Sequence, residues 1–454
     1  MDTKEKIKVL VNECVSSIIS MLGKAITQGS FALAVQETKV LTNNFGVKIL
    51  ETLCEKADAI FSESRDKHQV TIKDESKSRR LITELGEVTL KRVCYFDKKR
   101  QRRFFAVDEM LGLEKRYRIE QGLQAKLIEG AALTSFGRSS KSVNNIVSRQ
   151  SVYNLTKKLR KIEADEPLQR RVVDNIYIEA DEDHIHLQSG KSAEVKLIYV
   201  HDGVKTIGKG RTQLENVRYF VSIDDDPDKI WNDVAHYLYR NYTLRNSNIH
   251  ISGDGAQWIK YGQYVFPKAK YHIDKFHIQK SATIIAKGNK KVRSCILLAM
   301  RRNDQEMLKE ICVSQYMKYT ERSERQAIAD KYFYLRNNIN SYAIENRCSV
   351  EGHVSHVLSS RMSSRPMGWS KPGAGQIAKL RAFYFNGGNF FDLIRYGKTP
   401  AENMIEIYTN KFKSNFNIVK PGAASTAAEQ HRVIGFEGQI TPISRLLRGL
   451  LKIK

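Results

Sequence analysis

The fold is decided by an alternating run that ends in acids, Asn175-Ile-Tyr-Ile-Glu-Ala-Asp-Glu-Asp-His184. Alternation with period two is typical of a β-strand, so the run predicts a strand from Asn175 to Glu179 with Asp181 just after it. Asp183 would point to the same side of an extended chain, which leaves open which acid is the functional one. Because carboxylates are hard oxygen ligands, the run predicts a divalent-cation site at the end of a strand.

Further strand and helix signals follow this run in a defined order. Strand-like segments at 193–201 and 218–223 precede an amphipathic helix at 228–244, and strands follow at 248–252 and 271–273. Three strands, a helix and a strand ending in an acid is the order of a ribonuclease-H-like α/β core with a mixed five-stranded sheet. In that arrangement the first and fourth strands lie side by side, which would bring Asp181 close to Asp254.

Two more acids complete the predicted cation site. Asp254 lies in Ser-Gly-Asp-Gly, which is also a common plain turn, and Glu351 opens the helix-like segment Glu-Gly-His-Val-Ser-His. Such a triad can hold two Mg²⁺ or Mn²⁺ ions roughly 3.5 to 4 Å apart, a known arrangement for phosphodiester chemistry. His353, His356 and nearby Cys348 leave zinc as an alternative, although no second ligand pair completes a tetrahedral set.

The composition favours a polyanionic partner. The 454 residues include 75 Lys and Arg against 50 Asp and Glu, which gives a net charge of +25, and 41% are hydrophobic. This balance predicts a folded, multidomain protein that binds nucleic acid. The six cysteines form no Cys-x-x-Cys pair, which argues against a zinc ribbon or a disulfide framework. With a charged N-terminus and no expected membrane span, we expect a cytoplasmic, nucleoid-associated protein.

The first 110 residues divide into two predicted regions. Residues 1–78 show helical spacing and are expected to form a helical packing or dimerisation element. Residues 79–110 predict a β-hairpin with a basic tip that includes Lys98, Lys99 and Arg100. These side chains are candidates for phosphate contacts, although a charged hairpin end also protects a sheet edge from pairing.

Residues 111–170 predict a helix-turn-helix-like DNA-binding region. Residues 140–146 are expected to form a short helix, and Ser148 is expected to cap a second helix. No acidic residue occurs between positions 139 and 161, and the second helix would expose Arg149, Asn154 and Lys157 to bases and phosphates. Short helix pairs are also common in helical bundles, which remains the alternative.

The long gap between Asp254 and Glu351 implies an insertion. Residues 278–345 predict a basic helical insertion, so the catalytic domain is expected at 171–277 and 346–370, followed by a basic C-terminal extension at 371–454. Asp274 and His277 open the insertion, where they could simply cap and brace a helix. Arg361 and Arg365 follow Glu351 and are candidate phosphate clamps, with surface ion pairs as the alternative.

Four segments resemble the DDE transposases of the ISLre-two insertion-sequence family, within the Mutator-like superfamily. They are Tyr177-Ile-Glu-Ala-Asp-Glu-Asp-His, Gly253-Asp-Gly-Ala-Gln-Trp-Ile, Ile273-Asp-Lys-Phe-His and the block from Glu351 to Trp369. The likeness runs over nearly the whole chain. It implies that Asp181, Asp254 and Glu351 form a metal-binding triad. It also implies that Asp274 and His277 match the superfamily's Cys-or-Asp-x-x-His motif near the scissile phosphate.

The sequence therefore predicts a bacterial transposase with two Mg²⁺ or Mn²⁺ ions. It would cleave phosphodiesters at transposon ends and join the freed 3′-hydroxyl to target DNA. The expected partners are double-stranded DNA, as terminal inverted repeats and target, and further copies of the chain, at least a dimer on DNA. A stand-alone nuclease or resolvase on the same core is one alternative. A catalytically silent DNA-binding derivative is another.

Overall fold

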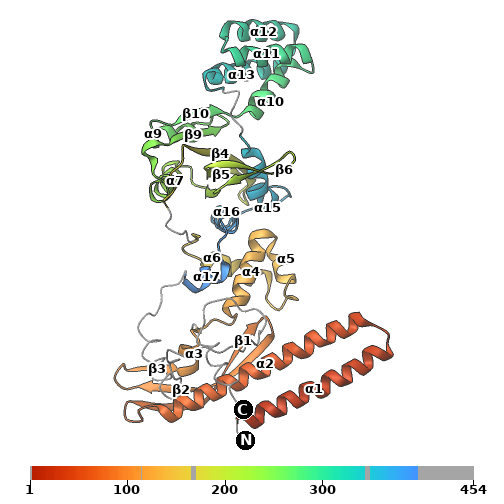
Figure 1. Cartoon of the computed structure of the whole chain (residues 1–454), viewed down its shortest axis with the longest axis vertical. Helices are drawn as coiled ribbons and strands as arrows, with labels where there is room; N and C mark the ends of the chain where they lie inside the picture. Colours follow the sequence, from red (N-terminus) through yellow and green to blue (C-terminus); the bar gives the residue numbers. More distant parts are fainter. Residues whose placement is uncertain (1–2, 114, 165–169, 343–347, 397–454) are drawn as a thin grey trace, which may run out of the picture. The chain divides into compact units, whose positions relative to one another are not determined.

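The computed structural model describes residues 3–113, 115–164, 170–342 and 348–396. The chain divides into two compact units between Leu123 and Gln124. Within the first, α1 (Thr3–Thr27) and α2 (Phe31–Ser64) form an antiparallel helical hairpin, with a turn at Gly29 and Ser30 as the N-cap of α2 (Figure 1). The predicted C-terminal extension beyond residue 396 lies outside the described residues.

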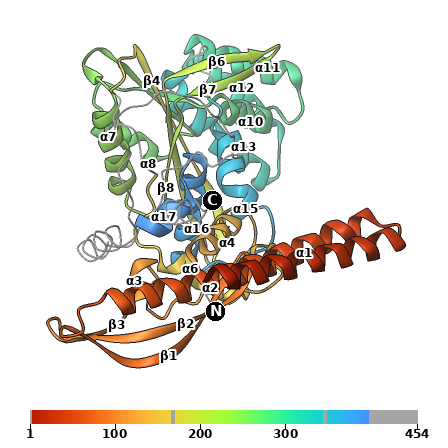
Figure 2. The same cartoon turned by 60° about the horizontal axis from the view of Figure 1, so that its bottom comes forward.

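A three-stranded antiparallel sheet packs against α2 (Figure 2). Its strands are β1 (Val70–Thr83), β2 (Gly86–Asp97) and β3 (Arg102–Phe105), and the helix α3 (Ala106–Met110) follows. The turn at 97–102, where the basic tip was expected, joins β2 to β3. The helical expectation for residues 1–78 is wrong from Val70 onward, because these residues pair with β2.

The first helix also corrects the expectation that no segment could span a membrane. Residues Lys8–Thr27 of α1 are long and apolar enough to do so, with a mean hydropathy of 1.5. Only 11% of this window is buried, although Met21 and Ala25 pack inside the hairpin. Apolar helices of this length occur both as membrane spans and as helices that pack against protein.

The second unit is built on a five-stranded mixed sheet, as predicted. The strand order is β10-β9-β4-β5-β8, with β4 antiparallel to β5 and parallel to β9. The bounds are β4 (Asn175–His186), β5 (Ser192–His201), β8 (Arg218–Ser222), β9 (Asn248–Gly253) and β10 (Lys270–Ile273). The prediction missed a two-stranded ribbon between β5 and β8, formed by β6 (Gly203–Gly208) and β7 (Arg211–Glu215).

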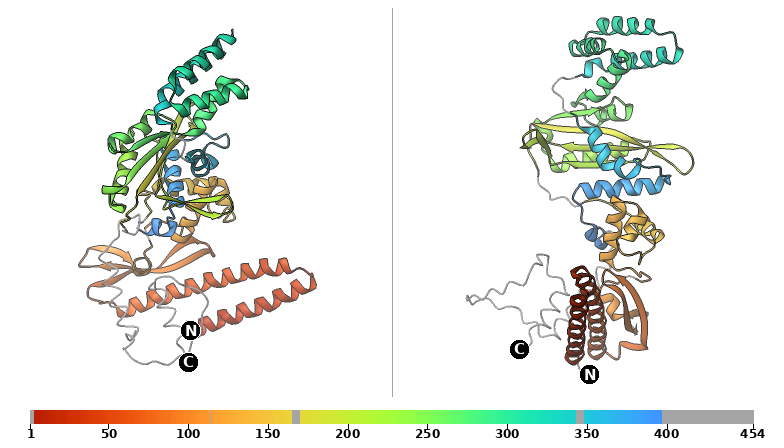
Figure 3. Two further views of the ribbon diagram at one scale, coloured as in Figure 1. Left: turned by 45° about the horizontal axis from the view of Figure 1, so that its top comes forward. Right: turned by 90° about the vertical axis from the view of Figure 1, so that its right-hand side faces the viewer.

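Helices cover both faces of this sheet (Figure 3). On one face, α7 (Asp228–Asn241) packs Trp231, Val234 and Leu238 on the even-numbered side chains of β4. It ends three residues before the predicted Leu244, where the short 3₁₀ helix η1 (Leu244–Asn246) begins. The small helices α8 (Gln257–Lys260) and α9 (Gly262–Val265) extend the same core.

The helices after the insertion return to the other face. They comprise α14 (Val350–Val354), the π-turn η3 (Ser355–Ser359), α15 (Ser360–Met362) and α16 (Lys371–Phe385). The helix α17 (Phe390–Tyr396) then ends the described residues. The expected domain boundary at residue 370 is wrong, because α16 packs on β5 and β8 and buries Ile377 and Leu380. The helix thus belongs to the same unit as the sheet.

The segment between β10 and α14 is helical, in agreement with the spacing of its apolar residues. It consists of α10 (Lys275–Ala286), α11 (Lys290–Arg302), α12 (Gln305–Lys318), α13 (Arg322–Asn338) and the 3₁₀ turn η2 (Ile339–Ser341). Its own core contains Ile285, Ile296, Leu308 and Leu335. A separate core means that the insertion is a small helical module attached to β10 (Figure 1).

The region predicted to contain a helix pair has three helices, α4 (Gln121–Leu133), α5 (Phe136–Lys141) and α6 (Arg149–Lys158). The helices α5 and α6 correspond to the predicted pair. Ser148 caps α6 as predicted, since its hydroxyl accepts a hydrogen bond from the Ser151 amide. The first helix lies earlier than expected, at 136–141 instead of 140–146. Asn144 and Asn145 both have left-handed φ angles, which ends helical geometry before Ile146.

Candidate metal and nucleic-acid site

The pairing of β4 with β9 aligns two of the predicted acids. Glu179 pairs with Ser252 at the last parallel pair of these strands. Asp181 and Asp254 each lie two residues further along, so both follow the paired region at the same level. The close approach of β9 to β4 at this level needs glycine at position 253, because a Cβ there would lie 2.7 Å from the Ala180 carbonyl oxygen. The Asp254 carboxylate is held by the Ala256 amide at 2.8 Å.

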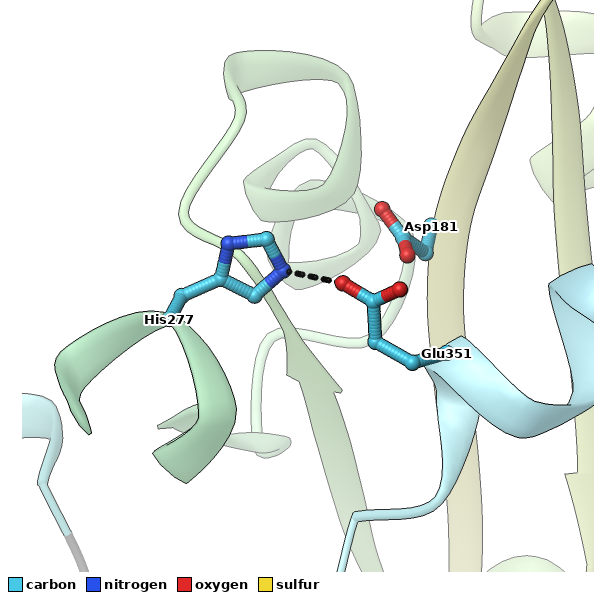
Figure 4. Close-up of side chains that lie close together, drawn as sticks. All are labelled: Asp181, His277 and Glu351. Atoms are coloured by element: carbon cyan, nitrogen blue, oxygen red, sulfur yellow. Dashed lines mark ion pairs between the residues drawn. The ribbon is translucent and has the colours of Figure 1, made fainter. Parts of the chain in front are cut away.

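Five side chains form what we call the carboxylate cluster: Asp181, Glu182, Asp254, Glu351 and His277. Ligand atoms of Asp181, Glu182 and Asp254 all lie within 4.8 Å of one another, and the same holds for Asp181, His277 and Glu351. Figure 4 shows the second group, with Asp181 facing Glu351 and His277. Asp181 belongs to both groups, so the cluster offers two adjacent cation positions that share one carboxylate.

Burial and like charge make this cluster electrostatically unfavourable without a cation or proton. Asp181 is only 7% exposed. Burial raises the pKa of its carboxyl to about 8, and the negative charges of Glu351, Glu182 and Asp254 add to the increase. Such a site favours either protonation or a bound cation. Its donors are mainly carboxylate oxygens, which fit Mg²⁺ or Mn²⁺ better than zinc.

The first turn of α10 brings a histidine to the cluster. Nε2 of His277 lies 3.0 Å from Oε1 of Glu351. Asp274 does not join the cluster's groups but caps α10, since its carboxylate accepts from the Phe276 amide at 3.1 Å. The Asp274 amide also donates to the Gly253 carbonyl oxygen at 2.8 Å, which ties α10 to the end of β9. The segment from Asp274 to His277 thus combines a helix cap, Asp274, with a side chain in the carboxylate cluster, His277.

Asp181 and Asp183 lie on the same face of β4, but the environment of Asp183 differs from that of Asp181. Oδ1 of Asp183 accepts a hydrogen bond from the Ser363 hydroxyl at 2.8 Å, so the side chain faces the residues that follow α15. It belongs to none of the potential ligand groups found among the described residues. The geometry therefore favours Asp181 over Asp183 as the first acid. Glu182, which the sequence analysis did not single out, joins the cluster and is fixed by the Trp258 indole N–H at 2.9 Å.

A buried network beside the cluster positions the chain that carries Glu351. The Glu179 carboxylate accepts the Ser349 amide at 2.8 Å, lies 3.2 Å from His201 Nε2, and accepts the Tyr199 hydroxyl. Burial alone would raise the pKa of Glu179, but these hydrogen bonds bring it below its ordinary value. A buried carboxylate two residues before Asp181 thus anchors the residue two before Glu351. Sequence reasoning missed it because Glu179 reads as an ordinary strand residue.

The histidines after Glu351 pack against aromatic rings. His353 stacks on Tyr199 with ring centroids 4.2 Å apart, and its Nδ1 lies 2.8 Å from the Tyr219 hydroxyl. His356 lies 4.8 Å from the Phe385 ring. Within the described ranges, neither forms a metal-ligand group with Cys348. The geometry therefore does not favour the alternative zinc site.

The predicted DNA-contacting side chains differ in their exposure. The side chains of the hairpin tip, of α6 and of Arg365 are exposed. At the tip and on α6 these are Lys98, Lys99, Arg100, Arg149, Asn154 and Lys157. Arg361 is wrong as a phosphate clamp, because it is 5% exposed and donates to the Ala131 carbonyl oxygen at 3.1 Å. Its guanidinium lies over the Trp369 ring, and burial lowers its pKa to about 10. Arg361 thus joins α15 to α4.

The fold and site define a mixed α/β protein with a carboxylate cluster just beyond the point where the parallel pairing of β4 with β9 ends. Residues 30–398 match the model of an uncharacterised protein family, UPF0236, and the chain belongs to this family.

Relatives in two organisms share most of the chain. UPF0236 protein TTE2489 of Caldanaerobacter subterraneus is 32% identical over 95% of this chain and 96% of the relative. Another relative from that organism, also 32% identical, covers 92% of this chain and 91% of itself, and its name joins eleven TTE designations. A UPF0236 protein in the vanSb 3′ region of Streptococcus gallolyticus is 26% identical over 69% of this chain and 74% of the relative.

Proposed function

We propose that this protein is a DNA transposase that cuts phosphodiesters at the ends of a mobile element and joins them to target DNA. The observation that carries the proposal is the sharing of Asp181 by two adjacent ligand groups. Two neighbouring cation positions are what the two-metal form of in-line displacement at phosphorus uses, one for the attacking and one for the leaving oxygen. The resemblance to the DDE transposases independently selects Asp181, Asp254 and Glu351.

The strand topology supports a ribonuclease-H-like core. Three antiparallel strands (β4, β5 and β8) are followed by α7, and β9 then pairs in parallel with β4. The order of strand and helix signals in the sequence predicts this arrangement, with the first and fourth strands side by side. The two-stranded ribbon between β5 and β8 and the helical insertion after β10 are additions that leave the order of the five strands unchanged.

The chemistry would rest on positioning. Asp181, Glu182, Asp254 and Glu351 would hold two Mg²⁺ or Mn²⁺ ions, which supply the charge that activates an attacking hydroxyl and stabilises the leaving oxygen. His277 orients Glu351 through the 3.0 Å contact, and its ring is close enough to the acids to hold a proton near a bound phosphate. Glu179 fixes the segment before Glu351. Because these side chains are already held in place, they need little rearrangement during the reaction.

The family members supply circumstantial support for mobility. A gene repeated within one genome is what a mobile element produces, and a name that joins eleven designations fits such repetition. The net charge of +25 and the exposed cations of α6 and of the turn at 97–102 suit a DNA partner.

The proposed assembly is at least a dimer on DNA, formed through the α1–α2 hairpin. This hairpin exposes large apolar side chains, among them Ile19 at 65%, Ile26 at 77% and Phe31 at 84%. A second copy is the simplest cover for such a surface, because identical hairpins can pack into a helical bundle.

The test uses the full chain and a labelled duplex that contains the DNA flanking its gene, with Mg²⁺ or Mn²⁺. We expect nicks at one defined position on each flank and products in which the 3′ end is joined to a second duplex. Cutting without joining would identify a stand-alone nuclease or resolvase. Binding without cutting would identify a silent derivative. Either result would overturn the proposed function.

A further inference from the structure

The β6–β7 ribbon, residues 203–215, is an exposed surface that contributes no residue to the carboxylate cluster. From Val204 to Leu214 it contains the cations Lys205, Lys209 and Arg211 and no acid. All three are exposed, and no ion pair is found for them among the described residues. Figure 2 shows the ribbon extending beyond the sheet.

The tip of the ribbon combines charge with an exposed apolar side chain. Thr206 pairs with Thr212 and Gly208 with Arg211, so Ile207 is an extra residue that bulges out of the ladder. Lys209 and Gly210 form the two-residue turn, where the φ of +73° at Gly210 suits glycine. Ile207 is 58% exposed and Val204 is 47% exposed. The tip thus presents an apolar group between cations.

The base of the ribbon, in contrast, is held firmly. The Asn216 side-chain amide donates to both oxygens of Asp202, at 3.0 and 2.9 Å. The Tyr242 hydroxyl also donates to Asp202, at 3.1 Å, which connects the base to the end of α7. An isolated two-stranded hairpin is marginally stable in water, so a fixed base is what keeps an exposed tip in a defined direction.

We propose that the β6–β7 ribbon inserts into a groove of the duplex DNA that the carboxylate cluster acts on. A two-stranded ribbon fits the major groove, and cations flanking an apolar side chain suit phosphates on either side of bases or sugars. Tyr177 on β4 pairs with His201 at the base, four residues from Asp181, which is about 13 Å along the strand. The tip at Gly208 lies five residues beyond Gly203, at most about 17 Å further, so one short duplex can reach both the tip and the carboxylate cluster. This inference rests on the proposed function for the identity of the partner.

The experiment measures binding of the full-length protein to a fluorescent 40-base-pair duplex of mixed sequence, by anisotropy at several salt concentrations. The variant combines Lys205→Gln, Lys209→Gln and Arg211→Gln. Because each lost phosphate contact removes about 0.9 units from the log–log salt slope, we expect a slope lower by roughly 2 to 3 units and affinity lower by tenfold or more. The matched control, Lys24→Gln with Lys39→Gln and Lys67→Gln, removes equal charge from exposed positions of α1, of α2 and of the turn that follows α2.

A second variant, Ile207→Ser, separates the apolar contact from charge. We expect it to weaken binding several-fold and to leave the salt slope unchanged, because it removes no cation. Thermal melts check that each variant folds. A charge variant that binds like wild type, or a control that loses as much slope, would overturn the ribbon as a DNA contact while leaving the proposed function standing. A wild-type protein that does not bind duplex DNA would overturn both.

Discussion

At the scale of single residues, Asp181 is the acid that both potential ligand groups of the carboxylate cluster share. Asp181 was expected after a strand but lies within β4 (Asn175–His186). The positions of Asp254 directly after β9 and of Glu351 in the first turn of α14 could be predicted, because strand and helix ends are marked by local patterns. Glu179 and Glu182 could not, since their roles depend on Ser349 and Trp258, which lie far away in the sequence. For the same reason Arg361 was misjudged: its contact with Ala131 has no local signal.

The raised pKa of Asp181 predicts a pH-dependent stability. A folded-state pKa of about 8, above the ordinary value, favours the protonated folded state. Stability from this group is therefore present at low pH and is lost as pH rises toward 8, by up to about 1.4 kcal/mol per pH unit. In EDTA, Asp181→Asn should gain stability relative to wild type as pH increases from 5 to 8. Urea melts measure this difference, and parallel pH curves would contradict it.

The contact between His277 and Glu351 predicts a catalytic rather than a structural role for this histidine. His277→Ala should leave the melting temperature close to that of wild type, because the side chain is partly exposed and the pair lies near solvent. Cleavage should fall by roughly 10² or more, the scale of a lost proton donor or charge-stabilising group.

The control for this variant is His186→Ala, which changes an exposed histidine on the same strand as Asp181. Thermal melts and cleavage assays are run on one preparation of each protein. A His277→Ala protein that is destabilised yet fully active per folded molecule would remove His277 from the active site.

At the scale of elements, periodicity predicts the helices and the core strands, but it does not predict the β6–β7 ribbon or the packing of α16. The five strands, α7, the α6 N-cap and the helical insertion all follow local apolar spacing or capping signals. The ribbon could not be predicted because its strands bury no side chain and β6 begins and ends with glycine, so the segment resembles a loop. The packing of α16 on β5 and β8 was missed because it is a tertiary contact between segments far apart in the chain.

The helix α6 carries a prediction about DNA reading. Asn154 and Lys157 are exposed on this helix, whereas Val152 and Leu155 are buried. Asn154→Ala should reduce preference for the element's own ends, and Lys157→Ala should weaken binding to all DNA and lower the salt slope by about one unit. Binding titrations at several salt concentrations measure both effects, with Lys39→Ala on α2 as the control. Unchanged affinity and preference in both variants would assign DNA reading to another element.

At the scale of the whole molecule, the exposed apolar face of α1 predicts self-association. The paired substitutions Ile19→Glu and Ile26→Glu should convert the proposed dimer to a monomer, because they place charge where a second copy would pack. Light scattering coupled to size-exclusion chromatography measures the mass, and Lys24→Glu on the same helix is the control. A wild-type monomer, or wild-type protein that partitions onto lipid vesicles through α1, would contradict assembly through this face.

The most direct measurement of the central claim compares cleavage of the flanking-DNA duplex by Asp181→Asn, Asp254→Asn and Glu351→Gln with cleavage by Asp183→Asn. Asp183 is the matched control, because it lies on the same face of β4 but bonds to Ser363 outside the carboxylate cluster. We predict that the three cluster variants fold and bind DNA but do not cut, whereas Asp183→Asn retains cleavage. Wild-type cleavage rates in Asp254→Asn or Glu351→Gln would contradict the assignment of the cluster as the active site.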